Sequence, residues 1–157
     1  MVRIKLVSVG RTKKEWIRQG MAHYQKLLRK YVELELVEIK EEKITKAKQT
    51  QAILDAEGER ILRCVPKPGL SIALDLRGEH LSSEGFARLL EDGLSRGYGN
   101  FTFVLGGPLG LSPGVLAACP VKLSLCRMTF AHEMSRMILL EQIYRAFSII
   151  KGTSYHK

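Results

Sequence analysis

The chain has 157 residues, with 25 Lys and Arg against 16 Asp and Glu, which gives a formal net charge of +9. This length suits a single domain, residues 1–157, that buries a core without metals or disulfides. No signal peptide or apolar run of the roughly 20 residues that cross a bilayer is visible, and the three cysteines lack metal or disulfide spacing. We therefore expect a cytosolic protein with reduced thiols, no bound metal and no membrane segment.

The expected elements alternate between strand and helix along the whole chain. Apolar periodicity predicts, in order, a strand at 3–9 and a helix at 13–31, a strand at 33–39 and a helix at 45–63, and a strand at 70–74 and a helix at about 83–95. A strand at 101–105 precedes a short helix that starts at Pro113 and is capped by Ser112. A strand at 122–126 and a helix at about 133–150 follow. This order is typical of an α/β fold with a mostly parallel sheet flanked by helices.

The last helix is unusually apolar. Of the 17 residues from 134 to 150, 11 are apolar, so most sides of this helix must be covered. Either it is a central core helix, or it forms a subunit interface. We predict a homodimer.

Basic residues gather toward the two ends of the sequence. Residues 1–50 hold 13 Lys and Arg against 6 Asp and Glu, residues 51–100 hold 6 against 8, and residues 101–157 hold 6 against 2. A fold that joins the ends would present a cationic face, which attracts polyanions such as nucleic acid. A solvated basic surface without a partner is the alternative.

Three strand ends could hold a ligand, since parallel sheets bind ligands beyond the carboxyl ends of their strands. These segments are 74–78, the glycine loop 106–110, and 125–130. Glycines in the second segment expose backbone groups to a flat ligand. The loop matches neither the Walker nor the dinucleotide glycine pattern, which disfavours a nucleoside triphosphate or NAD.

Taken together, the motifs resemble a known family. Val104 to Ser112, Leu123 to Phe130, His132, Glu141 to Ala146 and Tyr155-His156-Lys157 are similar to the small SPOUT methyltransferases that modify N3 of a pseudouridine in 23S ribosomal RNA. The resemblance extends over essentially the whole chain. One departure is Ala131, where members usually carry proline before the histidine, so the grip of that loop on its ligand is in question.

The resemblance implies a fold and a cofactor. It implies a C-terminal trefoil knot, which connectivity rules alone would reject, and S-adenosylmethionine bound among the knot loops. Carried over by motif, the cofactor contacts are Leu74, Gly107, Cys126, Arg127, Met128, Thr129, Phe130 and Ala131. Apolar residues such as Leu105 and Leu125 could instead be plain core.

The resemblance also points to residues on the acceptor side. His156 is the candidate proton acceptor or orienting group, with Tyr155 and Arg145 positioning the base. By itself, Arg145 would be read as the partner of Glu141 in an intrahelical ion pair, and His132 as a capping or core histidine. A tail that ends in Tyr155, His156 and Lys157 could be disordered or could stack on an RNA base.

The expected function is therefore a homodimeric methyltransferase that acts on ribosomal RNA or the ribosome. Two other classes stay open. A non-catalytic ribosome-associated RNA-binding protein would need the basic ends but not the glycine loop. The second is a small nucleotide- or flavin-binding α/β protein, and calorimetric titration with S-adenosylmethionine would distinguish all three classes.

Overall fold

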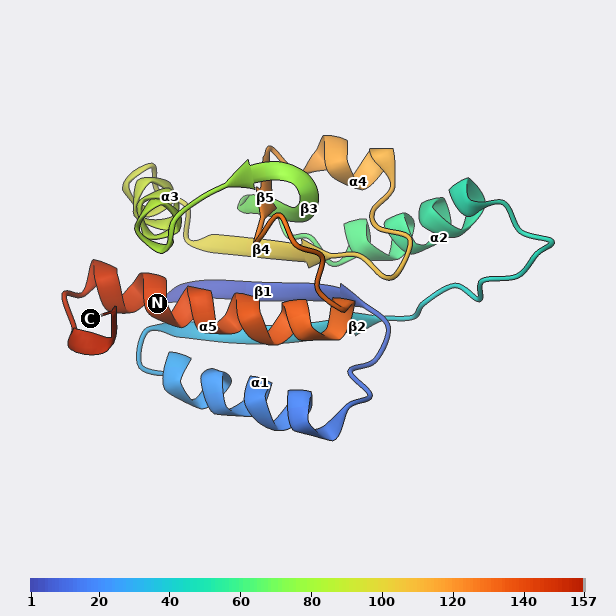
Figure 1. The fold of residues 1–157 in the computed structure, drawn as a ribbon. Coiled ribbons are helices and arrows are strands. Elements are labelled where there is room, and N and C mark those ends of the chain that lie inside the picture. The colour runs from blue at the N-terminus through green and yellow to red at the C-terminus, as the bar shows by residue number, and fades with distance from the viewer. Residues whose placement is uncertain (157) are drawn as a thin grey trace.

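The structure, a computed structural model, describes residues 1–156 and contains one parallel five-stranded sheet (Figure 1). The strand order is β2-β1-β4-β3-β5, and all four pairings are parallel. In chain order the elements are β1 Val2–Val9, α1 Glu15–Leu28, β2 Val32–Ile39, α2 Thr50–Arg63, β3 Leu70–His80, α3 Ser83–Ser95, β4 Asn100–Leu105, α4 Pro113–Ala118, β5 Val121–Ser124, α5 His132–Ile150 and the 3₁₀ turn η1 Ser154–His156.

Helices cover both faces of the sheet, which gives three layers. Helices α1, α3 and α5 lie on one face and α2 and α4 on the other (Figure 1). Alternate residues of one strand serve the two faces: Ile4 and Leu6 join the core under α1, α3 and α5, whereas Val7 and Val9 join the smaller core on the other face. The predicted α/β class with a parallel sheet flanked by helices is confirmed. The trefoil knot stays a prediction.

Two helices begin later than the sequence pattern indicates. The first starts at Glu15 rather than 13, because the backbone N–H groups of Lys13 and Lys14 donate to the Glu133 carboxylate at 2.6 and 3.1 Å. The second starts at Thr50 rather than 45. There the Thr45 hydroxyl accepts the N–H of Lys48 at 3.3 Å, which closes a local turn that competes with the helix.

The third strand is longer than predicted, and it bends. Instead of ending at residue 74, it continues to His80 and pairs with β5 twice, with a register shift between Leu74 and Glu79. Gly78 permits the close approach, since a Cβ there would lie 2.6 Å from the carbonyl carbon of Lys122. The fifth strand is shorter than predicted and ends at Ser124, which leaves Cys126 in the following loop.

Helix α5 is a central core helix. It packs between α1 and α3, and each of its residues is buried or half-buried. Its largest fully buried polar side chain is Arg136, whose guanidinium donates to the Thr12 hydroxyl at 2.8 Å and to the Val9 carbonyl at 2.7 Å. Burial within one chain thus accounts for much of the apolar character of α5, and the homodimer stays a prediction. None of the helices in residues 1–156 is long and apolar enough to span a membrane.

Candidate functional site

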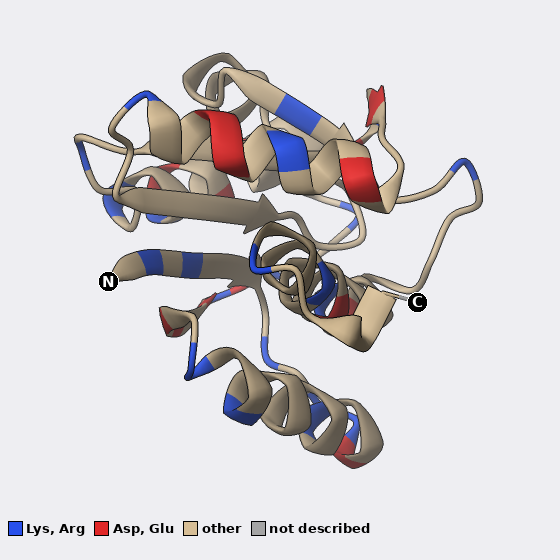
Figure 2. Ribbon diagram, turned by 90° about the vertical axis from the view of Figure 1, so that its left-hand side faces the viewer, with Lys and Arg blue, Asp and Glu red and all other residues tan. Residues whose placement is uncertain are grey.

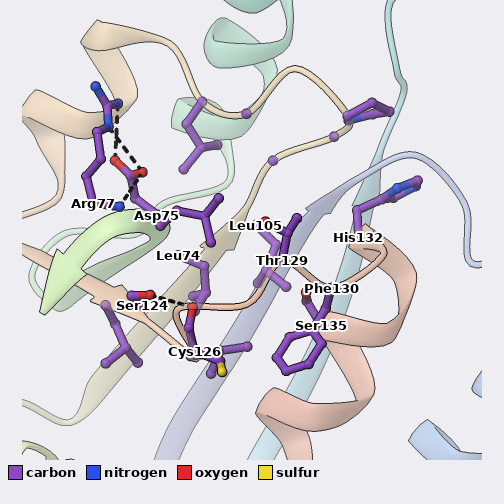
Figure 3. Close-up of a pocket in the computed structure, with 18 of the residues that line it drawn as sticks. Leu74, Asp75, Arg77, Leu105, Ser124, Cys126, Thr129, Phe130, His132 and Ser135 are labelled. Carbon is purple, nitrogen blue, oxygen red and sulfur yellow. Dashed lines mark hydrogen bonds and ion pairs between the residues drawn. The ribbon is translucent and has the colours of Figure 1, made fainter. Parts of the chain in front are cut away.

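A cavity of about 620 Å³ lies where the middle of β3, at Leu74 to Arg77, and the carboxyl ends of β4 and β5 meet the start of α5. Figure 3 shows side chains from these elements around it. Seven of the eight expected cofactor contacts line this cavity, namely Leu74, Gly107, Cys126, Met128, Thr129, Phe130 and Ala131. Arg127 lies in the same loop but is not among the described residues of the lining. Asp75 and Arg77, which belong to the expected ligand segment 74–78 but were given no individual role, also line the cavity, as does Ser135, which the sequence did not indicate.

The glycine loop is a tight turn on one wall of the cavity. Gly107 and Gly110 pair with each other, and the N–H of Gly110 donates to the Gly107 carbonyl at 3.0 Å. Gly110 has a φ of +88°, which favours glycine. A Cβ at Gly106 would lie 2.4 Å from the Gly110 carbonyl oxygen, so the turn requires a bare backbone at that position. At its glycines the loop therefore presents bare main-chain groups to a flat ligand, and Pro108 and Leu109 add apolar surface to the same wall.

The loop between β5 and α5 forms the opposite wall. The Ser124 hydroxyl donates to the Cys126 carbonyl at 3.1 Å, which turns the chain as it leaves the strand. His132 lines the cavity as the first residue of α5, and its side chain does not cap the helix. Met128 is 70% exposed, so it is free to cover a ligand. Together with Leu74, Met128 supplies apolar surface for the faces of an aromatic ring.

The tail residues form a second cluster at the far end of α5. Arg145 Nη1 lies 3.2 Å from His156 Nδ1, and the Arg145 guanidinium lies 4.8 Å from the centre of the Tyr155 ring. The Glu141 carboxylate accepts from Arg145 at 2.7 Å and from the Tyr155 hydroxyl at 3.2 Å. Glu84 of α3 lies 2.7 Å from His156 Nε2. The three acceptor-side candidates are thus brought together, and the expected Glu141–Arg145 ion pair is present.

Contacts with α5 hold the tail residues in place. The Tyr155 ring packs edge-on against Tyr144 with centroids 4.6 Å apart, and the N–H of Thr153 donates to the Ser148 carbonyl at 2.9 Å. Burial and the neighbouring Glu141 carboxylate raise the pKa of Tyr155 to about 12, so this phenol stays protonated at neutral pH. Lys157, the third tail residue of the sequence motif, lies outside the described residues.

The cavity and the tail cluster are separated within one chain. His132 stands at the first residue of α5 and Arg145 stands 13 residues further along the same helix. At a rise of 1.5 Å per residue this spacing is roughly 20 Å. The two groups of candidate residues therefore cannot act on one substrate atom within a single chain as it is folded here.

A basic surface follows α1 and its flanking loops. Residues 11–30 carry seven Lys and Arg against a single Glu, and all seven basic residues are exposed. Figure 2 marks Lys and Arg positions in blue along the ribbon of α1, together with others near the start of β1. Two have acidic neighbours, since Arg18 pairs with Glu15 at 3.0 Å and Lys13 approaches Glu41 at 3.9 Å. Among the described residues, no group of three or more His, Cys, Asp or Glu is placed to hold a metal ion.

Comparison with known proteins adds a family and relatives. Residues 2–156 match a family described as predicted SPOUT methyltransferase. A protein of Halothermothrix orenii named ribosomal RNA large subunit methyltransferase H is 42% identical over 99% of this chain and all of the relative. Proteins of the same name from Carboxydothermus hydrogenoformans and Symbiobacterium thermophilum are 43% and 44% identical, over 98% and 99% of this chain and 99% and 100% of the relatives.

A solved structure supports the fold. The structure of a probable methylase family protein from Haemophilus influenzae superposes with a TM-score of 0.55 at 16% identity, over 99% of this chain and 70% of that chain. At this level of identity the likeness concerns the fold alone.

Proposed function

Because the chain belongs to the SPOUT methyltransferase family, we propose that it methylates N3 of a pseudouridine in 23S ribosomal RNA, with S-adenosylmethionine as the methyl donor. The observation that carries the proposal is the identity of 42–44%, over nearly the full length, to ribosomal RNA large subunit methyltransferases. We assign the protein to the cytoplasm, where its substrate is found.

The lining of the cavity supports a donor of this kind, since it offers both main-chain and apolar contacts. The glycine loop offers main-chain N–H and C=O groups for the adenine edge, and the side chains of Leu74, Leu105 and Met128 offer apolar contact for its faces. When bound, the donor supplies an electrophilic methyl group on a sulfonium centre. The role of the chain is to hold the acceptor nitrogen in line with that methyl and to exclude water, which is a proximity effect.

The acceptor side needs a proton acceptor, since N3 of pseudouridine carries a proton. We assign this task to His156, with Arg145 and Tyr155 positioning the base. Tyr155 stays protonated at neutral pH, so it acts as a hydrogen-bond donor and a stacking surface and not as a base. In the structure both ring nitrogens of His156 are engaged, Nδ1 by Arg145 and Nε2 by Glu84. Substrate binding must therefore displace one of these partners.

A homodimer resolves the separation along α5. In a two-fold dimer the tail of one subunit can lie at the cavity of the other, so that each active site combines a donor cavity with the partner's tail. Exposed apolar side chains are available for an interface; Trp16 at the start of α1 is 54% exposed. The dimer would also carry two copies of the basic surface of residues 11–30, which suits a substrate as large as ribosomal RNA.

The proposed function is tested by donor binding together with methyl transfer. Calorimetric titration should give saturable binding of S-adenosylmethionine. Labelled methyl should then enter 23S RNA of ribosomes from a strain that lacks the enzyme, and mass spectrometry of the digested RNA should identify methylpseudouridine. A protein that binds ribosomes but neither the donor nor its demethylated product would contradict the proposal and favour the non-catalytic RNA-binding protein.

A further inference from the structure

The wall of the cavity formed by β3 carries a pair of opposite charges. Among the described residues that line the cavity, Asp75 supplies the only carboxyl group, Arg77 the only guanidinium and His132 the only imidazole. The rest of the lining is apolar side chains, hydroxyls, one thiol and the bare backbone of the glycine loop. Figure 3 shows Asp75 and Arg77 on the β3 side of the cavity and His132 on the α5 side.

The contacts within this pair are loose. Arg77 Nη2 lies 3.3 Å from Asp75 Oδ2 and Arg77 Nε lies 3.4 Å from Asp75 Oδ1. Charge-assisted bonds are usually about 2.7–2.9 Å long. The Asp75 side chain is 18% exposed, whereas the Arg77 side chain is 79% exposed. Asp75 is therefore fixed in the wall, and Arg77 can swing away at little cost, as is usual for an exposed ion pair.

We propose that Asp75 and Arg77 recognise the amino-acid end of the methyl donor, Asp75 taking the α-ammonium group and Arg77 the α-carboxylate. This inference rests on the proposed function, because it needs a donor of the adenosyl amino-acid class. An amino-acid zwitterion carries one charge of each sign, and the pair offers one partner for each. Binding replaces one intramolecular ion pair by two intermolecular ones, so no charge in the cavity is left without a partner.

The chemistry of each side chain fits its assigned group. A carboxylate has only acceptor atoms, which suits the three donors of an ammonium group. The planar guanidinium of Arg77 can grip a carboxylate through two parallel N–H bonds. The glycine loop and the loop before α5 are left for the adenosine part, which carries no charge. The cavity is thereby divided into a neutral, backbone-rich part and a charged part.

Asp75 also has a structural contact that the test must keep. The N–H of Arg77 donates to Asp75 Oδ1 at 3.2 Å, which stabilises the chain within the register shift of β3 between Leu74 and Glu79. Asparagine retains an oxygen at this position, so Asp75→Asn keeps the turn and removes the charge. Arg77→Met keeps an apolar stem and removes the guanidinium from a side chain that is mostly in solvent.

The experiment compares three ligands by calorimetry. S-adenosylhomocysteine has the whole amino-acid end, 5′-deoxy-5′-(3-aminopropylthio)adenosine lacks the carboxylate, and 5′-methylthioadenosine lacks both charged groups. Asp75→Asn should weaken binding of the first two ligands about tenfold, a loss of about 1.4 kcal/mol, and leave methylthioadenosine unchanged. Arg77→Met should weaken S-adenosylhomocysteine alone. Asp92→Asn, which removes a carboxylate from the exposed side of α3, is the matched control and should change no affinity.

The outcomes separate this inference from the proposed function. If the wild type binds none of the three ligands, the donor assignment itself fails. If both variants bind S-adenosylhomocysteine as tightly as the wild type does, the assigned roles of Asp75 and Arg77 are wrong. The assignment also fails if Asp75→Asn weakens the binding of all three ligands by the same factor. Circular dichroism shows whether the Asp75→Asn protein is misfolded. If it is, the affinity of the Arg77→Met protein for S-adenosylhomocysteine tests the proposal by itself, since Arg77 is exposed.

Discussion

The Glu84 carboxylate lies 2.7 Å from Nε2 of His156, which joins the first turn of α3 to the tail of the chain. A carboxylate accepts and a guanidinium donates, so these neighbours assign the proton of a neutral His156 ring to Nε2 and leave Nδ1 as the acceptor that faces Arg145. The hydrogen bond from His156 lowers the pKa of Glu84, which keeps that carboxylate ionised at neutral pH. Glu84 is therefore a positioning residue for the imidazole.

Replacing Glu84 should reveal whether His156 moves a proton. If it does, the charge of Glu84 stabilises the imidazolium, and both Glu84→Ala and Glu84→Gln should lower single-turnover methyl transfer to ribosomes by roughly tenfold. That loss is below the roughly hundredfold cost of losing an acid–base catalyst outright. Donor affinity should not change. Full activity in Glu84→Gln alone would mean that Glu84 only orients the ring, and full activity in both variants would remove Glu84 from the site.

Gly106→Ala should abolish donor binding and preserve the fold. The new Cβ would lie 2.4 Å from the Gly110 carbonyl oxygen. A Cβ has no rotatable bond that could move it away and this oxygen belongs to the backbone, so the turn must open. We expect no measurable binding of S-adenosylhomocysteine, which requires its dissociation constant to rise by about a hundredfold or more, a loss of about 2.8 kcal/mol. Gly106 is a cleaner probe than Gly107, where a Cβ would meet the core residue Val9 at 3.3 Å.

The control for this variant is another glycine of the same region. A Cβ at Gly114, in α4, meets nothing closer than 3.8 Å, so Gly114→Ala should bind the donor as the wild type does. Calorimetry measures the affinity and far-UV circular dichroism checks the fold. Wild-type affinity in a folded Gly106→Ala protein would show that the donor does not rely on this turn.

Sequence periodicity was enough to predict the class of fold and the number and order of the main helices and strands. Each strand is a short apolar or alternating run, and such runs carry a clear signal. Periodicity gave wrong boundaries for several elements, because single contacts determine where a helix or strand begins and ends. The interaction of Glu133 with the N–H groups of Lys13 and Lys14 delays α1, and no local pattern reveals a partner about 120 residues away.

The candidate site, too, could be predicted from the sequence only in part. The glycine loop could be predicted as a binding loop, because a run of glycines marks exposed backbone in the sequence. The loop between β5 and α5 was predicted from the family resemblance. Segment 74–78 was predicted as a candidate ligand site, but the pairing of Asp75 with Arg77 was not, because it depends on the bend of β3 and on both residues lying on the cavity wall. The separation of the cavity from the tail was also not visible, since it follows from the length and direction of α5.

Glu42 should stabilise the protein in a pH-dependent way. Hydrogen bonds from Lys48, at 2.7 Å, and from Arg60 lower its pKa from 4.5 to about 2. A depressed pKa in the folded state means that the stabilisation is complete above the unfolded value of 4.5 and is lost as the pH falls to about 2. Glu42→Gln should therefore lower the melting temperature at pH 7, and the difference from wild type should shrink between pH 4.5 and 2.

The control for Glu42 is a carboxylate with a weaker partner. Glu59 lies 4.0 Å from Arg63 on the exposed side of α2, an arrangement that contributes little. Glu59→Gln should leave the melting temperature nearly unchanged at each pH. A Glu42→Gln protein with the same deficit at pH 7 and pH 2 would contradict the assigned role of the two cations.

Tyr155 and His156 should affect different steps. Tyr155→Ala removes an aromatic ring that packs on Tyr144, and we expect RNA affinity to fall by about 1–3 kcal/mol, the range for base stacking. His156→Ala should instead lower turnover more than RNA affinity. Filter binding to 23S RNA and single-turnover transfer distinguish the two effects. Equal losses in both assays for both variants would indicate that the tail acts as one structural unit.

Deletion of residues 153–157 should remove methyl transfer and leave donor affinity nearly unchanged. It should also cost some stability, because the deletion removes the packing of Tyr155 on Tyr144 and the bond from the Thr153 N–H to the Ser148 carbonyl. Thermal unfolding measures that cost and calorimetry measures the affinity. Full transfer activity in the truncated protein would return the search for the acceptor site to Arg145 and the surroundings of His132.

Mixed dimers test the proposal that each active site uses two subunits. Gly106→Ala inactivates the cavity and spares the tail, whereas His156→Ala inactivates the tail and spares the cavity. If a cavity works with the partner's tail, one of the two sites in a mixed dimer has both wild-type parts. Co-expression with two affinity tags isolates that dimer, which should recover up to about half of wild-type turnover by this two-site symmetry. Each parent homodimer should be inactive. If cavity and tail act within one chain, each site of the mixed dimer retains one defect, and the mixed dimer should be as inactive as its parents.

Sedimentation at micromolar concentration provides the second arm, since a monomer of 17.7 kDa with full activity would overturn the two-subunit site directly. The tail would then have to change its fold to bring its residues across the roughly 20 Å that separate the cavity from the tail cluster along α5.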